Sequence, residues 1–396
     1  MTYNPSKLSL YTLEHRRHNM DILTLEEWLK RFHKPKSRTL TQFMKSAKVR
    51  SANRDTPLHE YMADKKIPMS DIEDLFTNIQ NRNDYLTRFF TMSLRIQPEK
   101  VHFDDKPMTL KHMNNNEQPI YKNLIRNIHY KGILKDTKSG LENVPTYLDM
   151  LENLYLHDII DYKILTPSAR FYMKEGRIGS VFSSYFFRAS IMNPYLVYSM
   201  NKSVLKGTRI FTPTLGWSSY CYGFLECPET KEYVGTDVID DVCEKTQDLA
   251  NIMRKDVLTK IYCKPSEDLA KNKAFLTKYR EHFDVVFFSP PYYKLEMYEG
   301  AEQSTSRYKT YEEWLEKYWH ATIQLCWHVL QKGGRMCYIL SGYGSENTKE
   351  QYDLLGDMNK ITKKYFKLRS KQVMHNKDVH VTKHKETAEQ IMVFVK

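Results

Sequence analysis

Several features that mark common functional classes are absent from the 396-residue sequence. Its six cysteines include no C-x-x-C pair, and no histidine stands at zinc-finger spacing, so we expect reduced thiols in a cytoplasmic compartment and no metal site. The first 20 residues contain no continuous apolar segment, so no signal peptide is expected. No run approaches the roughly 18 apolar residues of a membrane span. The G-x-G-x-x-G fingerprint of dinucleotide-binding proteins is also missing.

What the sequence has in excess is positive charge and aromatic side chains. Sixty Lys and Arg residues stand against 48 Asp and Glu residues, which gives a net charge of +12, and there are 28 Tyr and 18 Phe residues. A basic, aromatic-rich chain favours an anionic partner, nucleic acid before a membrane surface. Solubility alone is the simpler explanation of the same charge.

The first part of the chain, residues 1–170, is basic and carries helical patterns. Apolar residues recur with helical spacing in 21–32, 72–94 and 146–165, and Thr24 is placed to cap the first of these segments. We predict a mainly helical N-terminal domain over 1–170, a candidate for nucleic-acid recognition, and a second domain over 171–396.

From about residue 186 short apolar segments alternate with helical ones. Strands are predicted at 208–214, 232–238, 260–265, 284–291, 335–340 and 390–395. A helix over 311–330 is expected to end at Lys332-Gly333-Gly334. Such alternation predicts an α/β fold with a doubly wound sheet, in which ligands bind beyond the carboxyl ends of the strands.

Three predicted strand ends carry residues suited to a nucleotide-like ligand. A turn at Gly216 allows close approach of the backbone, and Asp237 follows about 20 residues later, where an acid can accept from ribose hydroxyls. Asp268 follows the third strand and could meet an adenine amine. A tight turn without a ligand and aspartates that cap helices are the structural alternatives.

The most specific motif is Ser289-Pro290-Pro291-Tyr292, which ends the fourth strand. Two prolines stiffen the loop and remove two backbone donors. The Ser289 side chain and the Pro290 carbonyl can then accept both hydrogens of an aromatic exocyclic amine and free its lone pair for attack on a methyl sulfonium. Tyr292 offers a face on which an extruded base can stack.

This motif, with the stretches "FFRASIMNPYLVYSM", "FTPTLGW" and "GTDV" before it, resembles the amino-methyltransferases that modify adenine N6 or cytosine N4 in DNA, and phage and viral members in particular. The resemblance covers about residues 180–396. It implies a Rossmann-like class I methyltransferase fold, S-adenosylmethionine as cofactor, DNA as partner and a flipped base as substrate. It assigns the cofactor to Phe187, Phe211, Thr212, Gly216, Asp237 and Asp268. Trp217 is a further candidate as an aromatic wall around the sulfonium, and Val238, next to Asp237, is added to the predicted cofactor residues.

One departure from the family stands in the cofactor turn, where Thr212, Ser218 and Ser219 replace the usual acid and glycines. Two alternatives therefore remain beside DNA methylation: methylation of an RNA base, and an inactive methyltransferase fold that binds nucleic acid. A dinucleotide oxidoreductase does not account for S-P-P-Y. The target base is left open, and target recognition is expected in the N-terminal domain together with residues 341–389. Residues 294–314 are expected to be a loop that closes over the base or an ordinary surface loop.

Overall fold

The computed structural model describes residues 22–34, 39–341, 352–374 and 389–396. The chain divides into two compact units, each built from separate stretches of sequence. The sheet unit contains Ile96–His129 and Ile191–Lys396, and the helical unit contains Leu23–Arg95 and Tyr130–Ser190. A single boundary near residue 170 does not describe this division, because 96–129 belongs to the sheet unit. Within 341–389, expected to add to target recognition, residues 342–351 and 375–388 lie outside the described residues.

Hydrogen bonds to a buried asparagine explain why 96–129 belongs with the sheet. Asn193 is fully buried, its side-chain nitrogen donates to the carbonyl of Glu117 at 2.6 Å, and its backbone nitrogen donates to the side chain of Asn115 at 2.7 Å. The Ser199 hydroxyl accepts from the backbone of Met108. These bonds join segments about 75 to 90 residues apart in sequence, so no local pattern indicates them.

The sheet unit is built on seven strands in the order β11-β12-β10-β8-β5-β6-β7. Strands β5, β6, β7, β8 and β10 are parallel, and β12 is antiparallel to both β10 and β11. The order reverses between β5 and β8, which is where doubly wound sheets bind ligands. The predicted α/β, Rossmann-like doubly wound sheet is confirmed. The strands are β5 Arg209–Thr212, β6 Glu232–Asp237, β7 Leu258–Cys263, β8 Phe283–Phe288, β10 Leu330–Leu340, β11 Lys367–Val373 and β12 Gln390–Val395.

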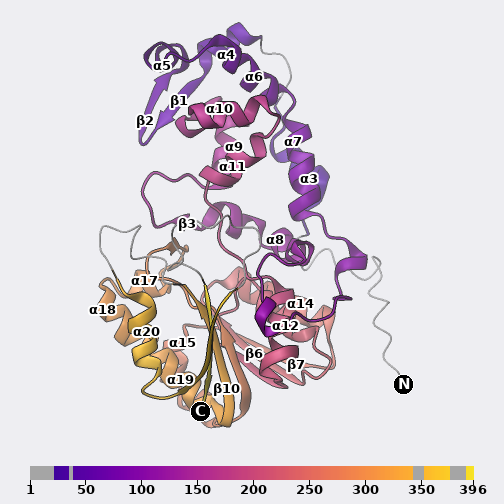
Figure 1. Cartoon of the computed structure of the whole chain (residues 1–396), viewed down its shortest axis with the longest axis vertical. Coiled ribbons are helices and arrows are strands. Elements are labelled where there is room, and N and C mark those ends of the chain that lie inside the picture. The colour runs from indigo at the N-terminus through magenta and orange to yellow at the C-terminus, as the bar shows by residue number, and fades with distance from the viewer. Residues whose placement is uncertain (1–21, 35–38, 342–351, 375–388) are drawn as a thin grey trace. The chain divides into compact units, whose positions relative to one another are not determined.

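Helices cover both faces of this sheet (Figure 1), so its central strands are continuous apolar runs rather than alternating ones. On one side lie α12 (Pro194–Met200), α13 (Ser219–Leu225) and α14 (Asp240–Met253). The other side carries α15 (Ser266–Leu269), α16 (Lys273–Lys278), α19 (Ala321–Val329) and α20 (Leu354–Thr362). Shorter elements of the unit are α8 Asn123–Ile128, β9 Glu296–Met297, α17 Ser304–Arg307 and α18 Tyr311–Trp314.

The helix predicted over 311–330 forms, but its expected glycine cap is wrong. The helix runs through α18, a π-helical turn at Leu315–His320 and α19, and ends at Val329. Strand β10 begins immediately at Leu330, and Gly333 lies inside it with φ +73°. The pairing register shifts between Leu330 and Arg335, so the glycines form a bulge in the strand rather than a helix end.

The helical unit confirms the predicted helical segments 21–32 and 72–94 and adds a small sheet. The segment 146–165 was only partly right, because its α-helix ends at Leu156 and Ile159–Asp161 form a strand. Thr24 and Glu27 form a reciprocal capping box at the start of α3. Strands β1 (Lys48–Ser51), β2 (Arg54–Pro57) and β4 (Ile159–Asp161) were not predicted, because each is too short to show a periodicity. The helices are α3 Leu25–Arg31, α4 Leu40–Ser46, α5 Leu58–Lys65, α6 Met69–Gln80, α7 Arg82–Phe89, α9 Tyr147–Leu156, α10 Pro167–Lys174 and α11 Ile178–Tyr185, and β3 is Lys138–Ser139.

All six cysteines are free thiols, and Cys263 alone among them is exposed. The described residues contain no group of three or more His, Cys, Asp or Glu side chains placed to hold a metal ion. Within the same ranges, every helix falls short of the length and hydrophobicity needed to cross a bilayer.

Candidate active site

The Ser289–Tyr292 tetrapeptide begins where the central strand β8 ends. Strand β8 lies between β5 and β10, with Val286 paired to Phe211 and Phe288 paired to Tyr338. The chain leaves regular structure at Ser289, as the two prolines require. The tetrapeptide therefore stands at the carboxyl edge of the sheet, at the reversal of strand order.

Hydrogen bonds fix the direction of the Ser289 hydroxyl. Its Oγ donates to the carbonyl of Ile339 at 3.0 Å, and the Ser289 backbone nitrogen donates to the Tyr220 hydroxyl at 3.0 Å. A serine hydroxyl has one hydrogen to donate and two lone pairs. Because the hydrogen is directed at Ile339, what Ser289 still offers is acceptor capacity.

The rest of the tetrapeptide is also held in place. The Tyr292 hydroxyl accepts from the backbone nitrogen of Ser341 at 3.0 Å, directly after β10. Pro290 is buried, whereas Pro291 and Tyr292 are half-buried, so part of the tyrosine ring remains accessible. Burial raises the pKa of Tyr292, which keeps its hydroxyl neutral at physiological pH.

The turn after β5 meets the tetrapeptide through the side chain of Tyr220. Gly216 has φ +53°, and a Cβ on it would lie 2.3 Å from Cζ of Tyr220. The Tyr220 ring thus occupies the space that any larger residue at Gly216 would need, while its hydroxyl holds the backbone of Ser289. One aromatic side chain connects the predicted cofactor turn to the predicted catalytic loop.

Asp237, at the end of β6, closes the same edge of the sheet. Its Oδ2 accepts from the backbone of Leu215 at 3.0 Å, and its Oδ1 accepts from Val238 at 2.8 Å and Ile239 at 3.3 Å. A carboxylate offers about four lone-pair positions, so capacity for roughly one further donor remains. Burial raises the pKa of Asp237, and the three backbone bonds oppose this rise. Asp237 thus joins the turn after β5 to the loop after β6 and holds the backbone that leads into α14.

Thr212 and Phe211 serve mainly the interior of the sheet unit. The Thr212 hydroxyl bonds the Tyr233 hydroxyl at 2.7 Å, and both residues are fully buried. The Phe211 ring is stacked on Phe283 with 5.5 Å between the ring centroids and lies 6.1 Å from Phe275. Both predicted site residues are therefore accounted for by core packing.

Trp217 lies next to Gly216 in the turn and is largely buried. Its ring lies 5.7 Å from His129 and 6.1 Å from Tyr298 between centroids. Tyr298 belongs to the polar segment that follows the tetrapeptide. An aromatic pair from these two loops would suit a positively charged sulfonium.

Asp268 is engaged by an arginine that the sequence did not single out. Arg307, in α17, donates to Asp268 at 2.9 Å and to the buried Glu267 at 3.0 Å. The Arg307 guanidinium thus joins the segment after S-P-P-Y to α15, which follows β7. The Trp314 indole nitrogen also donates to the Ser304 hydroxyl of the same loop, at 3.0 Å. Residues 296–307 are therefore fastened at several points.

Seven of the eight predicted cofactor residues belong to the sheet unit. Phe187 belongs to the helical unit, where its backbone bonds Pro145 at 3.0 Å and Tyr147 at 2.8 Å.

Two buried hydroxyl groups near the turn lack a hydrogen-bond partner among the described residues. They belong to Ser219, directly after the turn, and to Tyr318, whose pKa is raised by burial and further by the Glu267 and Asp237 carboxylates. Buried polar groups without partners are uncommon and point to a missing ligand or water. With the space kept by Gly216 and the remaining acceptor capacity of Asp237, they fit a polar, nucleoside-like cofactor at this edge.

Sequence reasoning missed two interacting charged residues, the half-buried Glu389 and the buried Lys122. Glu389, just before β12, acts electrostatically on Tyr292, Tyr220 and Lys122. Burial raises the pKa of Glu389. Burial also lowers the pKa of Lys122 to about 7. The positive charge of Arg126 lowers the pKa of Lys122 further, and the negative charge of Glu389 opposes this change. The two residues are far apart in the sequence, so no local signal indicates the pair.

The lowered pKa of Lys122 predicts a specific pH dependence of stability. In the unfolded chain this lysine titrates near 10.5 and in the folded protein near 7. Between these values the unfolded state binds more protons, so Lys122 makes stability rise with pH by about 1.4 kcal/mol per unit. Below about pH 7 Lys122 is charged in both states, and its burial lowers the free energy of unfolding by the full amount. We expect Lys122→Met to remove this rise, measured by urea unfolding at pH 7.5 and 9.0.

The exposed Lys111 of the same segment provides the control, because Lys111→Met should leave the pH profile parallel to that of the wild type. Parallel profiles for Lys122→Met and the wild type would show that burial does not lower the pKa of Lys122.

No protein-family model and no curated protein matches the chain. Solved structures do match over about half of it. TrmN from Thermus thermophilus is 13% identical with a TM-score of 0.33, over 52% of this chain and 49% of its own. A putative SAM-dependent methyltransferase from Streptococcus mutans is 13% identical with a TM-score of 0.36, over 53% and 52%. The N-methyltransferase NodS from Bradyrhizobium japonicum WM9 is 10% identical with a TM-score of 0.33, over 51% and 83%. The assignment of the fold rests on the strand order described above.

Proposed function

We propose that the protein transfers a methyl group from S-adenosylmethionine to an exocyclic amine of a flipped base in DNA, adenine N6 or cytosine N4. The observation that carries this proposal is the orientation of Ser289. Its hydroxyl hydrogen is directed at the Ile339 carbonyl, so its lone pairs are left to accept from an incoming amine. The resemblance of Ser289–Tyr292 to the amino-methyltransferase motif supports the same reaction.

The residues of the site would divide the work as follows. When bound, S-adenosylmethionine supplies a methyl group on a positively charged sulfur, so that the new C–N bond forms as the C–S bond breaks. Asp237 and the turn at Gly216 would hold the ribose and the amino-acid end of this cofactor. Ser289 and the Pro290 carbonyl would accept the two amine hydrogens, which localises the nitrogen lone pair. Tyr292, with its hydroxyl tied to Ser341, would stack on the base.

One binding experiment and one methyl-transfer experiment test the proposal in sequence. Calorimetry with S-adenosylmethionine should give saturable binding, and a lack of binding would favour an inactive fold. Labelled S-adenosylmethionine offered with equal amounts of duplex DNA and RNA should then label the DNA. Label in the RNA alone would support the same methyl-transfer reaction with RNA, not DNA, as the substrate.

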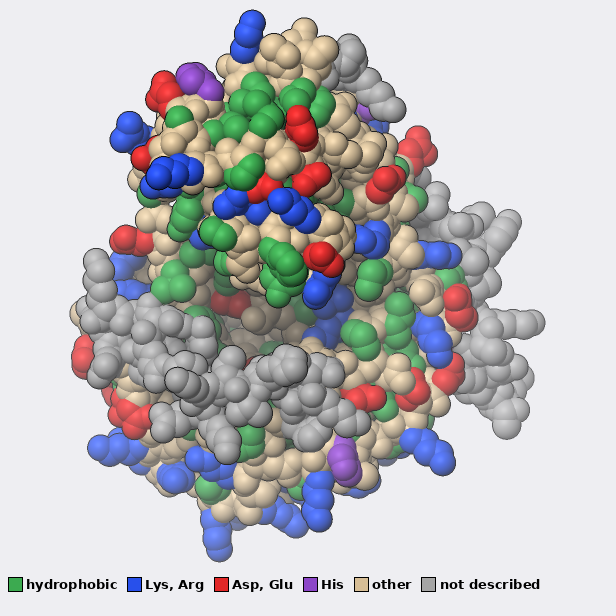
Figure 2. Space-filling model, turned by 45° about the horizontal axis from the view of Figure 1, so that its top comes forward, with side chains coloured by type: hydrophobic (Ala, Val, Ile, Leu, Met, Phe, Trp, Pro, Cys, Tyr) green, Lys and Arg blue, Asp and Glu red, His purple; other side chains and the backbone are tan. Residues whose placement is uncertain are grey.

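The charge of the chain supports a nucleic-acid partner. On the face shown in Figure 2, Lys and Arg side chains are scattered with Asp and Glu side chains between them. A net charge of +12 attracts a polyanion in a salt-dependent manner. The exposed basic residues of the helical unit would then contribute to binding without reading sequence.

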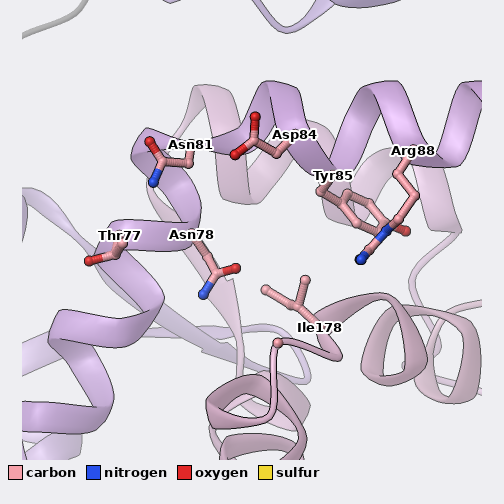
Figure 3. Close-up of a pocket in the computed structure, with 8 residues that line it drawn as sticks. Thr77, Asn78, Asn81, Asp84, Tyr85, Arg88 and Ile178 are labelled. Atoms are coloured by element: carbon pink, nitrogen blue, oxygen red, sulfur yellow. The ribbon is translucent and has the colours of Figure 1, made fainter.

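A pocket in the helical unit offers a defined contact for such a partner. It measures about 220 Å³ and lies between α6, α7 and the start of α11 (Figure 3). Arg88, Asn78 and Ile178 point into it. The Arg88 guanidinium lies 5.7 Å from the ring centroid of Tyr85 and forms no ion pair with any described residue. Its lining residues are Thr77, Asn78, Asn81, Asp84, Tyr85, Arg88, Gly176 and Ile178.

We expect Arg88→Ala to weaken DNA binding and to lower the slope of log affinity against log salt by about 1, because one phosphate contact is lost. Fluorescence anisotropy at several salt concentrations measures both quantities. The control is Arg31→Ala in the same unit, since Arg31 already bonds Glu152 at 2.6 Å and is not available to a phosphate. Equal losses in the two variants would argue against a phosphate contact at Arg88.

A further inference from the structure

The turn that follows β5 has an unusual backbone. Gly216, Trp217 and Ser218 are consecutive and have φ values of +53°, +56° and +66°. Left-handed backbone suits glycine and is disfavoured for residues with a Cβ, and more than one such residue in succession is rare. Strain of this kind persists only where surrounding contacts impose it, and it is concentrated at functional sites.

A buried chain of hydrogen bonds imposes this conformation on Ser218. Its Oγ lies 2.8 Å from Nε2 of His129 and 2.7 Å from Oγ1 of Thr246, and all three residues are buried. The Thr246 hydroxyl donates to the carbonyl of Val242 at 2.6 Å. Nearby, the backbone of Leu215 is held by Asp237. The strained residue is thus fixed by a histidine that precedes it by 89 positions.

The protons in this chain can be assigned by counting donors. Thr246 directs its one hydrogen at Val242, so it can only accept from Ser218. Ser218 therefore directs its own hydrogen at Thr246 and must accept from His129, whose Nε2 carries the ring proton. Burial lowers the pKa of His129 to about 3, in keeping with a neutral ring. Its Nδ1 makes no hydrogen bond with the described residues, and the Asp241 carboxylate lies 4.0 Å away.

We propose that His129 is a positioning residue for the cofactor: its bond to Ser218 holds the turn after β5 in the left-handed conformation that the cofactor site requires. This deepens the proposed function and rests on it. Glycine would reach the same conformation without help. Here a serine does so, and the histidine of the 96–129 segment supplies the constraint that makes the serine tolerable.

Two substitutions of Ser218 separate this role from ordinary packing. Ser218→Ala keeps the strained Cβ and loses the bond to His129, so we expect its affinity for S-adenosylhomocysteine to fall about tenfold. Ser218→Gly loses the same bond but removes the strain, so its affinity should stay within about twofold of the wild type. Isothermal titration calorimetry with S-adenosylhomocysteine measures both.

Substitutions of His129 complete the test. His129→Leu should lower the affinity for S-adenosylhomocysteine about tenfold. His129→Gln should keep much of this affinity, because its amide can still donate to Ser218. In the double variant, Ser218→Gly should suppress the defect of His129→Leu. The rise in KM for S-adenosylmethionine should exceed the fall in kcat. The control is His102→Leu in the same segment, which breaks a bond to Glu226 and should leave cofactor affinity unchanged.

The outcomes distinguish this proposal from the proposed function. If the wild type fails to bind the cofactor, the proposed function is wrong. Backbone strain at Ser218 still predicts that Ser218→Gly unfolds at a higher temperature than Ser218→Ala. The reverse order of unfolding temperatures would overturn the role given to His129. If the wild type binds, equal losses of affinity in the two Ser218 variants would overturn the positioning role. Full affinity in a folded His129→Leu protein would do the same.

Discussion

Ser289→Ala is expected to lower the rate of methyl transfer to DNA by about 10²–10³-fold, the range measured when one aligned polar group is removed from a transition-state site. The substitution removes the only acceptor that the Ser289 side chain offers, while the bond from its backbone nitrogen to Tyr220 remains. Affinity for the cofactor should therefore be unchanged. Single-turnover assays with labelled S-adenosylmethionine, paired with calorimetry, separate the two quantities.

The same substitution at Ser203 is the matched control. Its hydroxyl also donates to a backbone carbonyl, that of Met108 at 2.6 Å, and it lies outside the strand-end loops. Ser203→Ala should keep the transfer rate. If Ser289→Ala also keeps the transfer rate, the acceptor role assigned to this hydroxyl is wrong.

The transfer rate of Tyr292→Phe should fall between those of the wild type and Tyr292→Ala, since it keeps the stacking ring and loses only the bond to Ser341.

Gly216→Ala is the second change expected to have a large effect. Its Cβ would lie 2.3 Å from the ring of Tyr220, and φ of +53° already disfavours alanine. Tyr220 must move, and its hydroxyl then leaves the backbone of Ser289. We expect cofactor affinity to fall more than about 100-fold and stability to fall by about 1–3 kcal/mol. Calorimetry and urea unfolding measure the two effects.

Gly333→Ala separates backbone strain from the clash. Gly333 has φ +73°, yet a Cβ there would meet nothing within 4 Å. It should lose a similar amount of stability from strain alone and bind the cofactor as the wild type does. Gly216→Ala with full cofactor affinity would show that the Tyr220 contact does not shape the site.

Much of the sheet was predictable because its central strands are buried on both faces and appear as short apolar runs between turns. All six predicted strands form. The edge strand β11 was missed because its sequence, KLRSKQV, alternates exposed and half-buried residues and carries three positive charges. Its pairing with the apolar β12 creates the strand, and that pairing is not visible in the seven residues themselves.

The candidate site was predictable only where its residues follow strand ends. Gly216 lies in the turn after β5, Asp237 is the last residue of β6 and Ser289 directly follows β8, and parallel strands bring their carboxyl ends to one edge. His129, Lys122 and Glu389 approach from the segment 96–129 and from the start of β12. Their contacts span long distances in sequence, so only the folded chain brings them to this edge. Phe211 is a different case, because a strand-end aromatic residue that the resemblance assigns to the cofactor packs against Phe283 in the core.

The most direct test of the proposed reaction is the identity of the methylated nucleoside. Duplex DNA incubated with the protein and labelled S-adenosylmethionine is digested and its nucleosides are separated by mass spectrometry. The account predicts label in N6-methyladenine or N4-methylcytosine, and none with Ser289→Ala. Label at a ring carbon such as C5 of cytosine, or no label from a protein that binds the cofactor, would contradict it.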